Sequence, residues 1–378
     1  MKELAIYIHI PFCGNKCYYC DFTSFSGMDK RVNEYMDFLI KEMDLYKDIL
    51  KEYTIKTIFI GGGTPSYIEG KHILRIIEFI RENYNSSAIE EITIEANPGT
   101  LNREKLIQYK EAGVNRISLG VQTLNDKLLK SIGRNHSSKD VIENIELLRE
   151  LEFSNINVDL MFALPNQTLE DCISTLEVVT DLEVEHISYY SLILEEKTLM
   201  DKWYREGKIQ LPDDELDRQM YHKGVEFLKS RGYKHYEISN FCKTGYECKH
   251  NLFYWKLKPY VGFGISSHSN IGNKRFCNFS NFKDYFNYLK ESKLPISEVE
   301  HIDRNMEMAE YMIMGLRLID GINKDMFKKR FNKDIKEIYG GVINKYTKGG
   351  LLQEDGVNIK FIEKGLDLSN IVYVDILP

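Results

Sequence analysis

"LAIYIHIPFCGNKCYYCDF", residues 4–22, joins a strand-like run to a loop that carries three of the chain's seven cysteines. The apolar and β-branched residues of 4–10 are typical of a buried strand. Pro11, Gly14 and Asn15 then favour a loop, although spacings of four and three residues would also suit one face of a helix. The sequence therefore predicts that the first strand ends in a loop that holds Cys13, Cys17 and Cys20.

The same order of strand, polar turn and helix repeats through the first half of the chain. Short β-branched runs lie at 4–10, 55–62, 90–97, 115–121, 155–162 and 186–192, and amphipathic stretches lie at 31–52, 71–84, 102–112, 139–152 and 168–181. This alternation predicts an α/β fold with parallel strands and right-handed crossovers. A closed eight-fold barrel, an open six-fold barrel and a doubly wound sheet all fit the pattern. Each would bring the residues that follow the strands to one edge.

The pattern changes twice in the second half. It becomes irregular and aromatic after about residue 200, and it is helical again from about 303. The tail has a turn at Asp355 and Gly356 between apolar runs, which predicts a β-hairpin. We therefore expect the parallel α/β unit at 1–200, an extension at 201–300, and a small α+β domain of winged-helix type at 301–378.

Composition excludes several classes of function. The 378 residues are 43% hydrophobic and 28% charged, which is ordinary for a globular protein. A net charge of -7 argues against nucleic-acid binding, because no surplus of basic residues exists to neutralise phosphates. No apolar run approaches the ~20 residues that cross a bilayer. An odd, unevenly spaced set of cysteines and no signal-peptide pattern favour a reducing, cytoplasmic location.

Clustered thiols in a reducing compartment suggest metal binding, because thiolates select zinc or iron–sulfur clusters. Three interpretations of the cysteine loop fit the spacing. The cysteines are buried neighbours by chance, or they bind zinc with His9 as the fourth ligand, or they hold an iron–sulfur cluster.

The spacing C-x3-C-x2-C resembles the hallmark of the radical S-adenosylmethionine (SAM) superfamily. The resemblance implies a partial (βα)6 barrel related to the TIM barrel, in which Cys13, Cys17 and Cys20 hold a [4Fe–4S] cluster. One iron is then left open for SAM, whose C–S bond is cleaved with an electron from the cluster. The missing fourth cysteine is explained in this way.

Further motifs resemble the branch of oxygen-independent coproporphyrinogen oxidases and their relatives. They are "YIHIPFC" (7–13), "GGGTPS" (61–66), "TIEANPG" (93–99), "SLGVQT" (118–123), "IGRNH" (132–136) and "NVDLMFALP" (157–165). The glycines are expected to offer exposed backbone groups to SAM. Taken singly, each polar residue would be interpreted as solvated or salt-bridged. The resemblance implies that SAM is bound by Tyr7, Tyr19, Gly62, Gly63, Thr64, Glu95, Gln122, Arg134 and Asp159.

Two departures separate this chain from the oxidases, which carry a further cysteine two residues after the third and an N-terminal extension. Phe22 stands at that position here, and Cys13 lies almost at the start of the chain. Both features resemble the haem chaperone HemW family. The resemblance implies a protein that binds haem and passes it to haem-requiring proteins, needs an electron donor and leaves room for a homodimer. The alternatives are an oxidase-like enzyme acting on coproporphyrinogen III and a zinc-bound structural protein.

The segment "HNLFYW" (250–255) matches the H-N-x-x-Y-W signature of the HemW family. An imidazole can ligate haem iron, so the resemblance makes His250 a candidate haem contact, with His268 as a second candidate. The aromatic residues Tyr254 and Trp255 would stack on a macrocycle or pack in a core. The spacing of the nearby Cys242 and Cys248 suits no familiar zinc site, so we interpret them as ordinary thiols, with haem thiolate ligation as the alternative.

Overall fold

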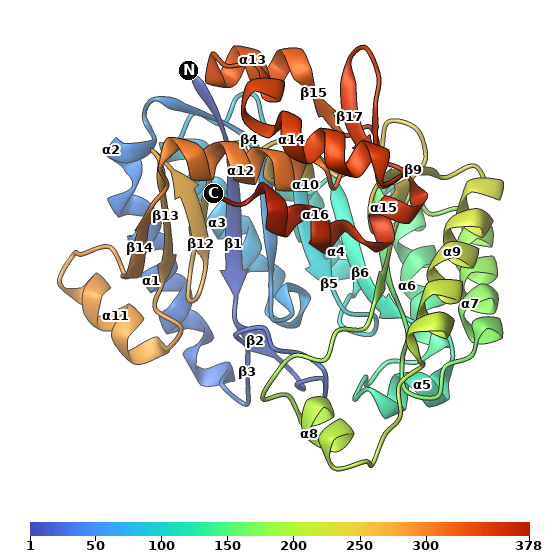
Figure 1. Cartoon of the computed structure of the whole chain (residues 1–378). Helices are drawn as coiled ribbons and strands as arrows, with labels where there is room; N and C mark the ends of the chain where they lie inside the picture. The colour runs from blue at the N-terminus through green and yellow to red at the C-terminus, as the bar shows by residue number, and fades with distance from the viewer.

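The computed structural model describes all residues 1–378, and its main feature is one mixed sheet of twelve strands. The six predicted strands are confirmed as neighbours in parallel order: β1 (Lys2–Ile10), β4 (Tyr53–Gly62), β5 (Glu91–Ala96), β6 (Arg116–Gln122), β7 (Ile156–Phe162) and β8 (His186–Ser191). Strand β1 does not pair with β8, so the sheet stays open. Of the alternatives that the periodicity left, the structure therefore has the open, partial barrel (Figure 1).

Helices connect the parallel strands and cover the outer face of the sheet (Figure 1). Apolar residues at helical spacing explain their orientation, since Ile73, Ile76, Ile77 and Ile80 are all fully buried. Ser137 and Thr168 each begin a helix with a capping box. The helices are α1 (Val32–Leu45), α2 (Lys47–Leu50), α3 (Gly70–Asn83), α4 (Arg103–Glu111), α5 (Asp126–Ser131), α6 (Ser138–Glu150) and α7 (Leu169–Asp181), with short 3-10 turns at Asp29–Arg31 and Pro65–Tyr67.

The segment 201–300 extends both edges of this sheet and shares its core. Strand β11 (Tyr260–Phe263) adds a seventh parallel strand beside β1, and β10 (Asn240–Cys242) pairs antiparallel with β8. One cluster of 60 buried residues runs from Leu4 to Leu289. The remaining elements are α8 (Leu199–Arg205), α9 (Asp214–Ser230), β9 (Lys234–Glu237), α10 (Lys249–Trp255), β12 (His268–Ile271), β13 (Lys274–Asn278), α11 (Phe282–Lys290) and β14 (Ile296–His301).

A separate core of 17 buried residues defines the C-terminal domain. The predicted hairpin is confirmed, and Asp355 holds its turn by accepting hydrogen bonds from the amides of Val357 and Asn358. The order of elements is that of a winged helix, followed by two short helices that the sequence did not predict. The elements are α12 (Arg304–Gly315), β15 (Ile322–Asn323), α13 (Lys324–Phe331), α14 (Ile335–Lys348), β16 (Leu352–Glu354), β17 (Asn358–Phe361), α15 (Glu363–Asp367) and α16 (Ser369–Ile376).

The C-terminal domain and the cysteine loop lie at opposite ends of the parallel strands (Figure 1). The loop leaves β1 at its C-terminal end, where β2 (Phe12–Cys13) pairs with β3 (Phe25–Ser26). At the other end, the C-terminal domain contacts β9 through a hydrogen bond from the Ile319 amide to the Tyr236 carbonyl oxygen, 3.1 Å. The Arg317 guanidinium also lies 4.4 Å from the ring centre of Trp255 in α10. No helix combines the length and the apolar character that crossing a membrane requires.

Candidate functional site

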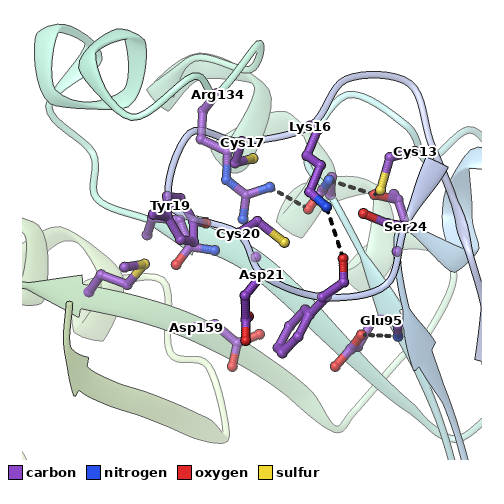
Figure 2. A pocket seen from close by; sticks show the side chains of 18 of the residues that line it. Cys13, Lys16, Cys17, Tyr19, Cys20, Asp21, Ser24, Glu95, Arg134 and Asp159 are labelled. Atoms are coloured by element: carbon purple, nitrogen blue, oxygen red, sulfur yellow. Dashed lines mark hydrogen bonds between the residues drawn. The ribbon is translucent and has the colours of Figure 1, made fainter. Parts of the chain in front are cut away.

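A cavity of about 390 Å³ opens at the C-terminal ends of the parallel strands. Figure 2 shows side chains from the cysteine loop and from several successive strands pointing into it. The cavity is lined by all three cysteines and by eight of the ten other predicted site residues: Tyr19, Gly62, Gly63, Thr64, Glu95, Gln122, Arg134 and Asp159. The structure therefore brings together residues that span almost 150 positions of sequence.

The cysteine loop is tied down at several points. The Phe25 amide donates to the Pro11 carbonyl oxygen at 2.8 Å, and the Tyr18 amide donates to the Ile132 carbonyl oxygen at 3.1 Å. Cys13 is buried, and Cys17 and Cys20 are half-buried. The three cysteines lie within eight positions of one loop and all line the cavity. Their common loop and their thiol chemistry suit an iron–sulfur cluster.

The glycine run lets the end of β4 lie against the cysteine loop. A Cβ atom at Gly63 would lie 2.7 Å from the Phe12 carbonyl oxygen, and one at Gly62 (φ +110°) would lie 2.5 Å from the His9 ring. The amides of Gly63 and Thr64 donate to the carbonyl oxygens of Ile10 and Phe12, at 2.9 and 2.8 Å. We expected this run to offer exposed backbone groups to SAM. For the N–H groups of Gly62, Gly63 and Thr64 this is corrected, because each already donates a hydrogen bond within the protein.

Two carboxyl groups enter the cavity from β5 and β7, the strands on either side of β6. Glu95 accepts a hydrogen bond from the Gly62 amide at 3.1 Å. Burial, reinforced by the charge of Asp159, raises the pKa of Glu95 to about 8. Asp159 accepts from Ser118 Oγ at 3.0 Å and from Asn157 Nδ2 at 2.8 Å. A pair of carboxyl groups with few neutralising cations is suited to bind an amino or hydroxyl group of a ligand.

Arg134 supplies the buried positive charge of the cavity. Burial opposes its charge, but the nearby Tyr19 phenol and Cys17 thiol outweigh this and raise the pKa of Arg134. Its Nη1 donates to Asn97 Oδ1 at 2.8 Å, and Asn97 Nδ2 donates to Thr64 Oγ1 at 3.0 Å (Figure 2). Asn97 was not predicted as a site residue. Its signal in the sequence is its place in the motif "TIEANPG" (93–99), two positions after Glu95.

Gln122 lies at an irregular point of the sheet. Its φ is +69°, and the register between β6 and β7 shifts between Gly120 and Gln122. Such a shift turns a side chain toward a site. Gln122 Oε1 accepts a hydrogen bond from the Tyr190 hydroxyl at 3.1 Å, so the amide is held in the cavity wall.

Apolar side chains border the mouth of the cavity. Phe22 is 60% exposed and Ile193 is 69% exposed, and both line the opening. Lys16 Nζ donates to the Phe22 carbonyl oxygen at 3.2 Å and thereby holds the end of the cysteine loop (Figure 2). Phe22, which the sequence singled out, therefore lies at the entrance and not within the core.

Tyr7 and His250 do not line the cavity. The Tyr7 hydroxyl lies 3.0 Å from His9 Nδ1 in the barrel interior. His250 is 1% exposed, and its ring nitrogens lie 2.9 Å from Thr57 Oγ1 and 2.9 Å from the Tyr254 hydroxyl. No ring nitrogen is free for a haem iron, so the structure argues against the expected haem contact of His250 in this conformation.

The second haem candidate, His268, and the two thiols near this motif do not line the cavity either. His268 is exposed on β12. The thiols that we interpreted as ordinary are both fully buried: Cys242 and Cys248.

Two family models match the chain. The model of the radical SAM superfamily matches residues 7–179, and the model of the HemN C-terminal domain matches residues 302–368. The heme chaperone HemW of Bacillus subtilis is 38% identical over 98% of this chain and 98% of its own length. The heme chaperone HemW of Escherichia coli is 37% identical over 72% of this chain and 71% of its own length.

A more distant relative and a solved structure extend the comparison. The mitochondrial radical S-adenosyl methionine domain-containing protein 1 of Danio rerio is 30% identical over 90% of this chain and 79% of its own length. The coproporphyrinogen III oxidase HemN of Escherichia coli superposes with a TM-score of 0.86 over 99% of this chain and 90% of that chain. Its 22% identity supports a common fold and no more.

Proposed function

The chain belongs to the HemW family of the radical SAM superfamily, and from this premise we propose that it is a haem chaperone, which binds haem and passes it to haem-requiring proteins. The observation that carries the proposal is the 38% identity with a heme chaperone HemW along 98% of both chains. The cavity supports it, because the motif residues of the radical SAM superfamily converge there on three thiols.

In this proposal the cavity holds a [4Fe–4S] cluster and SAM. Cys13, Cys17 and Cys20 would ligate three irons, and the fourth would be left for SAM. When bound, the cluster supplies single electrons. Glu95 and Asp159 would bind amino and hydroxyl groups of SAM, and loading the site with a cationic amino group would favour the ionised form of Glu95. Arg134 would face an anionic group, since its charge is permanent.

The remaining parts of the proposal concern partners and location. We propose haem and haem-accepting proteins as partners, an electron donor for the cluster, and a cytoplasmic location. A homodimer is compatible with this function. His250 is not needed as a haem ligand in this scheme, since its ring nitrogens bind within the barrel.

A paired assay on anaerobically reconstituted protein tests the function. One arm titrates haem into the protein and then follows haem transfer to an apo-haemoprotein by its absorption spectrum. The other arm incubates the reduced protein with SAM and coproporphyrinogen III and measures protoporphyrinogen. We expect haem binding and transfer without porphyrinogen turnover.

Cys17→Ala is the matched control for the cluster. We expect it to lose iron, sulfide and SAM binding while the fold survives, because a loop at the strand ends contributes little to the core. Robust protoporphyrinogen formation by the wild type would replace the chaperone with an oxidase-like enzyme. Tightly held zinc with little sulfide would reject the cluster altogether.

A further inference from the structure

The interior of the barrel below the cavity is polar. Barrels of this kind are usually filled by branched apolar side chains. Here the inward positions of β6, β7 and β8 carry Ser118, Asn157 and His186, which are 4%, 1% and 0% exposed. Buried polar groups are costly unless they are hydrogen-bonded, so their arrangement needs a reason.

These side chains form one continuous chain of hydrogen bonds that ends on Asp159. The Tyr236 hydroxyl lies 2.8 Å from His186 Nε2, and His186 Nδ1 lies 2.5 Å from Asn157 Oδ1. Asn157 Nδ2 lies 2.8 Å from Asp159 Oδ1 and 2.7 Å from Ser118 Oγ. We call Tyr236, His186, Asn157 and Ser118 the relay.

The direction of each hydrogen bond follows from chemistry. A carboxylate only accepts, so Asn157 must present its NH2 group to Asp159 and its Oδ1 to His186. His186 Nδ1 therefore donates, and Nε2 accepts from the Tyr236 hydroxyl. Burial lowers the pKa of His186 well below its ordinary value, which keeps the ring neutral with a single N–H. Ser188 Oγ adds a second donor to Asn157 Oδ1 at 3.2 Å.

The Asp159 carboxylate therefore fixes the orientation of Asn157. If the amide flipped, Oδ1 would face the carboxylate, and this contact would be repulsive. The His186 tautomer with its proton on Nδ1 matches the Asn157 orientation that the carboxylate requires. Ser118 Oγ donates to the second carboxylate oxygen, so both oxygens of Asp159 are held by buried donors.

We propose that Asn157 and Ser118 are positioning residues that orient the Asp159 carboxylate for SAM, with His186 and Tyr236 fixing the Asn157 amide. This inference rests on the proposed function, because it assumes that the cavity binds SAM. It adds Asn157, His186 and Tyr236, which do not line the cavity, and Ser118, which lines it and donates a hydrogen bond to Asp159.

A double-mutant cycle tests the proposal on reconstituted, full-length protein. SAM affinity is measured by anaerobic titration calorimetry for wild type, Asn157→Leu, Asp159→Ala and the double variant. Iron and sulfide content and the melting temperature are recorded for each. We expect Asn157→Leu to weaken SAM binding about tenfold, because it removes a hydrogen bond to a charged group. In the Asp159→Ala background the same substitution should have no effect.

Thr93→Val is the matched control. Thr93 is another fully buried polar residue of the barrel, and its hydroxyl donates to Glu91 and not to Asp159. It should leave SAM affinity unchanged. The SAM-induced change in the electron paramagnetic resonance spectrum of the reduced cluster gives a second readout. We expect that change to be diminished in Asn157→Leu at equal cluster content.

Ser118→Ala is the second variant, in case Asn157→Leu does not fold. It removes the other hydrogen-bond donor to Asp159, and it is a milder change because only one oxygen atom is lost. Its effect should also vanish in the Asp159→Ala background. Equal losses in both backgrounds, or an unchanged affinity in Asn157→Leu and Ser118→Ala, would overturn the proposal. A wild type that binds SAM but transfers no haem would remove the chaperone function alone. A wild type that binds no SAM would overturn this inference and the proposed SAM site, whereas haem transfer would still be decided by its own assay.

Discussion

Glu42 is predicted to make the fold less stable as pH rises through neutrality. This glutamate of α1 is fully buried, where it accepts hydrogen bonds from the Gly264 amide at 2.8 Å, from Asn278 Nδ2 at 2.6 Å and from the Tyr285 hydroxyl at 2.5 Å. Burial raises its pKa from 4.5 to about 7, against the opposing effect of these three donors. Through these hydrogen bonds, the Glu42 carboxyl group connects α1 to the loop after β11 and to α11.

The sign of the effect follows from the protons that each state binds. Below pH 4.5 the carboxyl is protonated in both the folded and the unfolded protein, so it has no influence. Between pH 4.5 and 7 only the folded protein keeps the proton, and the free energy of unfolding falls by about 1.4 kcal/mol per pH unit. Above pH 7 the loss is complete, at about 3 kcal/mol.

Urea unfolding of wild type and Glu42→Gln between pH 5 and 8.5 measures this contribution. The variant cannot ionise, so the difference in unfolding free energy between the two proteins should change by about 2 to 3 kcal/mol over this range. Glu34→Gln, on the exposed side of the same helix, is the control and should follow wild type. A constant difference between wild type and Glu42→Gln from pH 5 to 8.5 would refute the reasoning.

Two further substitutions separate structural from ligand-binding roles. His250→Ala should leave the haem spectrum and haem affinity unchanged but lower the melting temperature, because Thr57 and Tyr254 lose a buried partner; a lost haem band at an unchanged melting temperature would restore His250 as a ligand. Gly63→Ala should lower the iron and sulfide content of reconstituted protein, because its Cβ would push the Phe12 backbone and the cysteine loop away; a full cluster in this variant would show that the loop tolerates the displacement.

The parallel strands could be predicted because their signals are local. Each has a β-branched run of adequate length, followed by a turn and an amphipathic helix. Strand β11 has only the four residues Tyr260–Phe263, and its partner β1 lies at the other end of the domain's sequence, where Ala5 pairs with Tyr260. Nothing in four residues indicates such a distant partner. The place of 201–300 within the sheet could not be predicted for the same reason.

The candidate site could be predicted from its motifs, but a motif does not say which of its residues bind. Three cysteines at fixed spacing are a specific signal for a cluster site. Asn97 lies in the motif "TIEANPG", but only its contacts with Arg134 and Thr64 show that it belongs to the site. For His250 the family signature was misleading in the opposite way. It suggested a haem contact, but both ring nitrogens lie within hydrogen-bond distance of Thr57 and Tyr254 inside the protein.

The sequence does contain a signal for the polar barrel interior, namely polar residues at alternate positions of otherwise apolar strands. In β7 the inward positions are Asn157 and Asp159, and the alternate residues Ile156, Val158 and Leu160 are apolar and face the helices. In β8 the inward positions begin with His186. A strand that alternates in this way usually has one face in water. Here both faces are covered, so the polar face must bind within the protein.

The polar interior extends from the cavity at one end of the barrel to the C-terminal domain at the other end. Asp159 lines the cavity, and Tyr236 at the other end of the relay contacts the C-terminal domain through its carbonyl oxygen and Ile319. The Tyr236 hydroxyl also accepts from the Cys248 amide at 3.3 Å, just before the helix that carries His250. The H-N-x-x-Y-W segment therefore closes the barrel at the end opposite the cavity, and its histidine is buried for that reason.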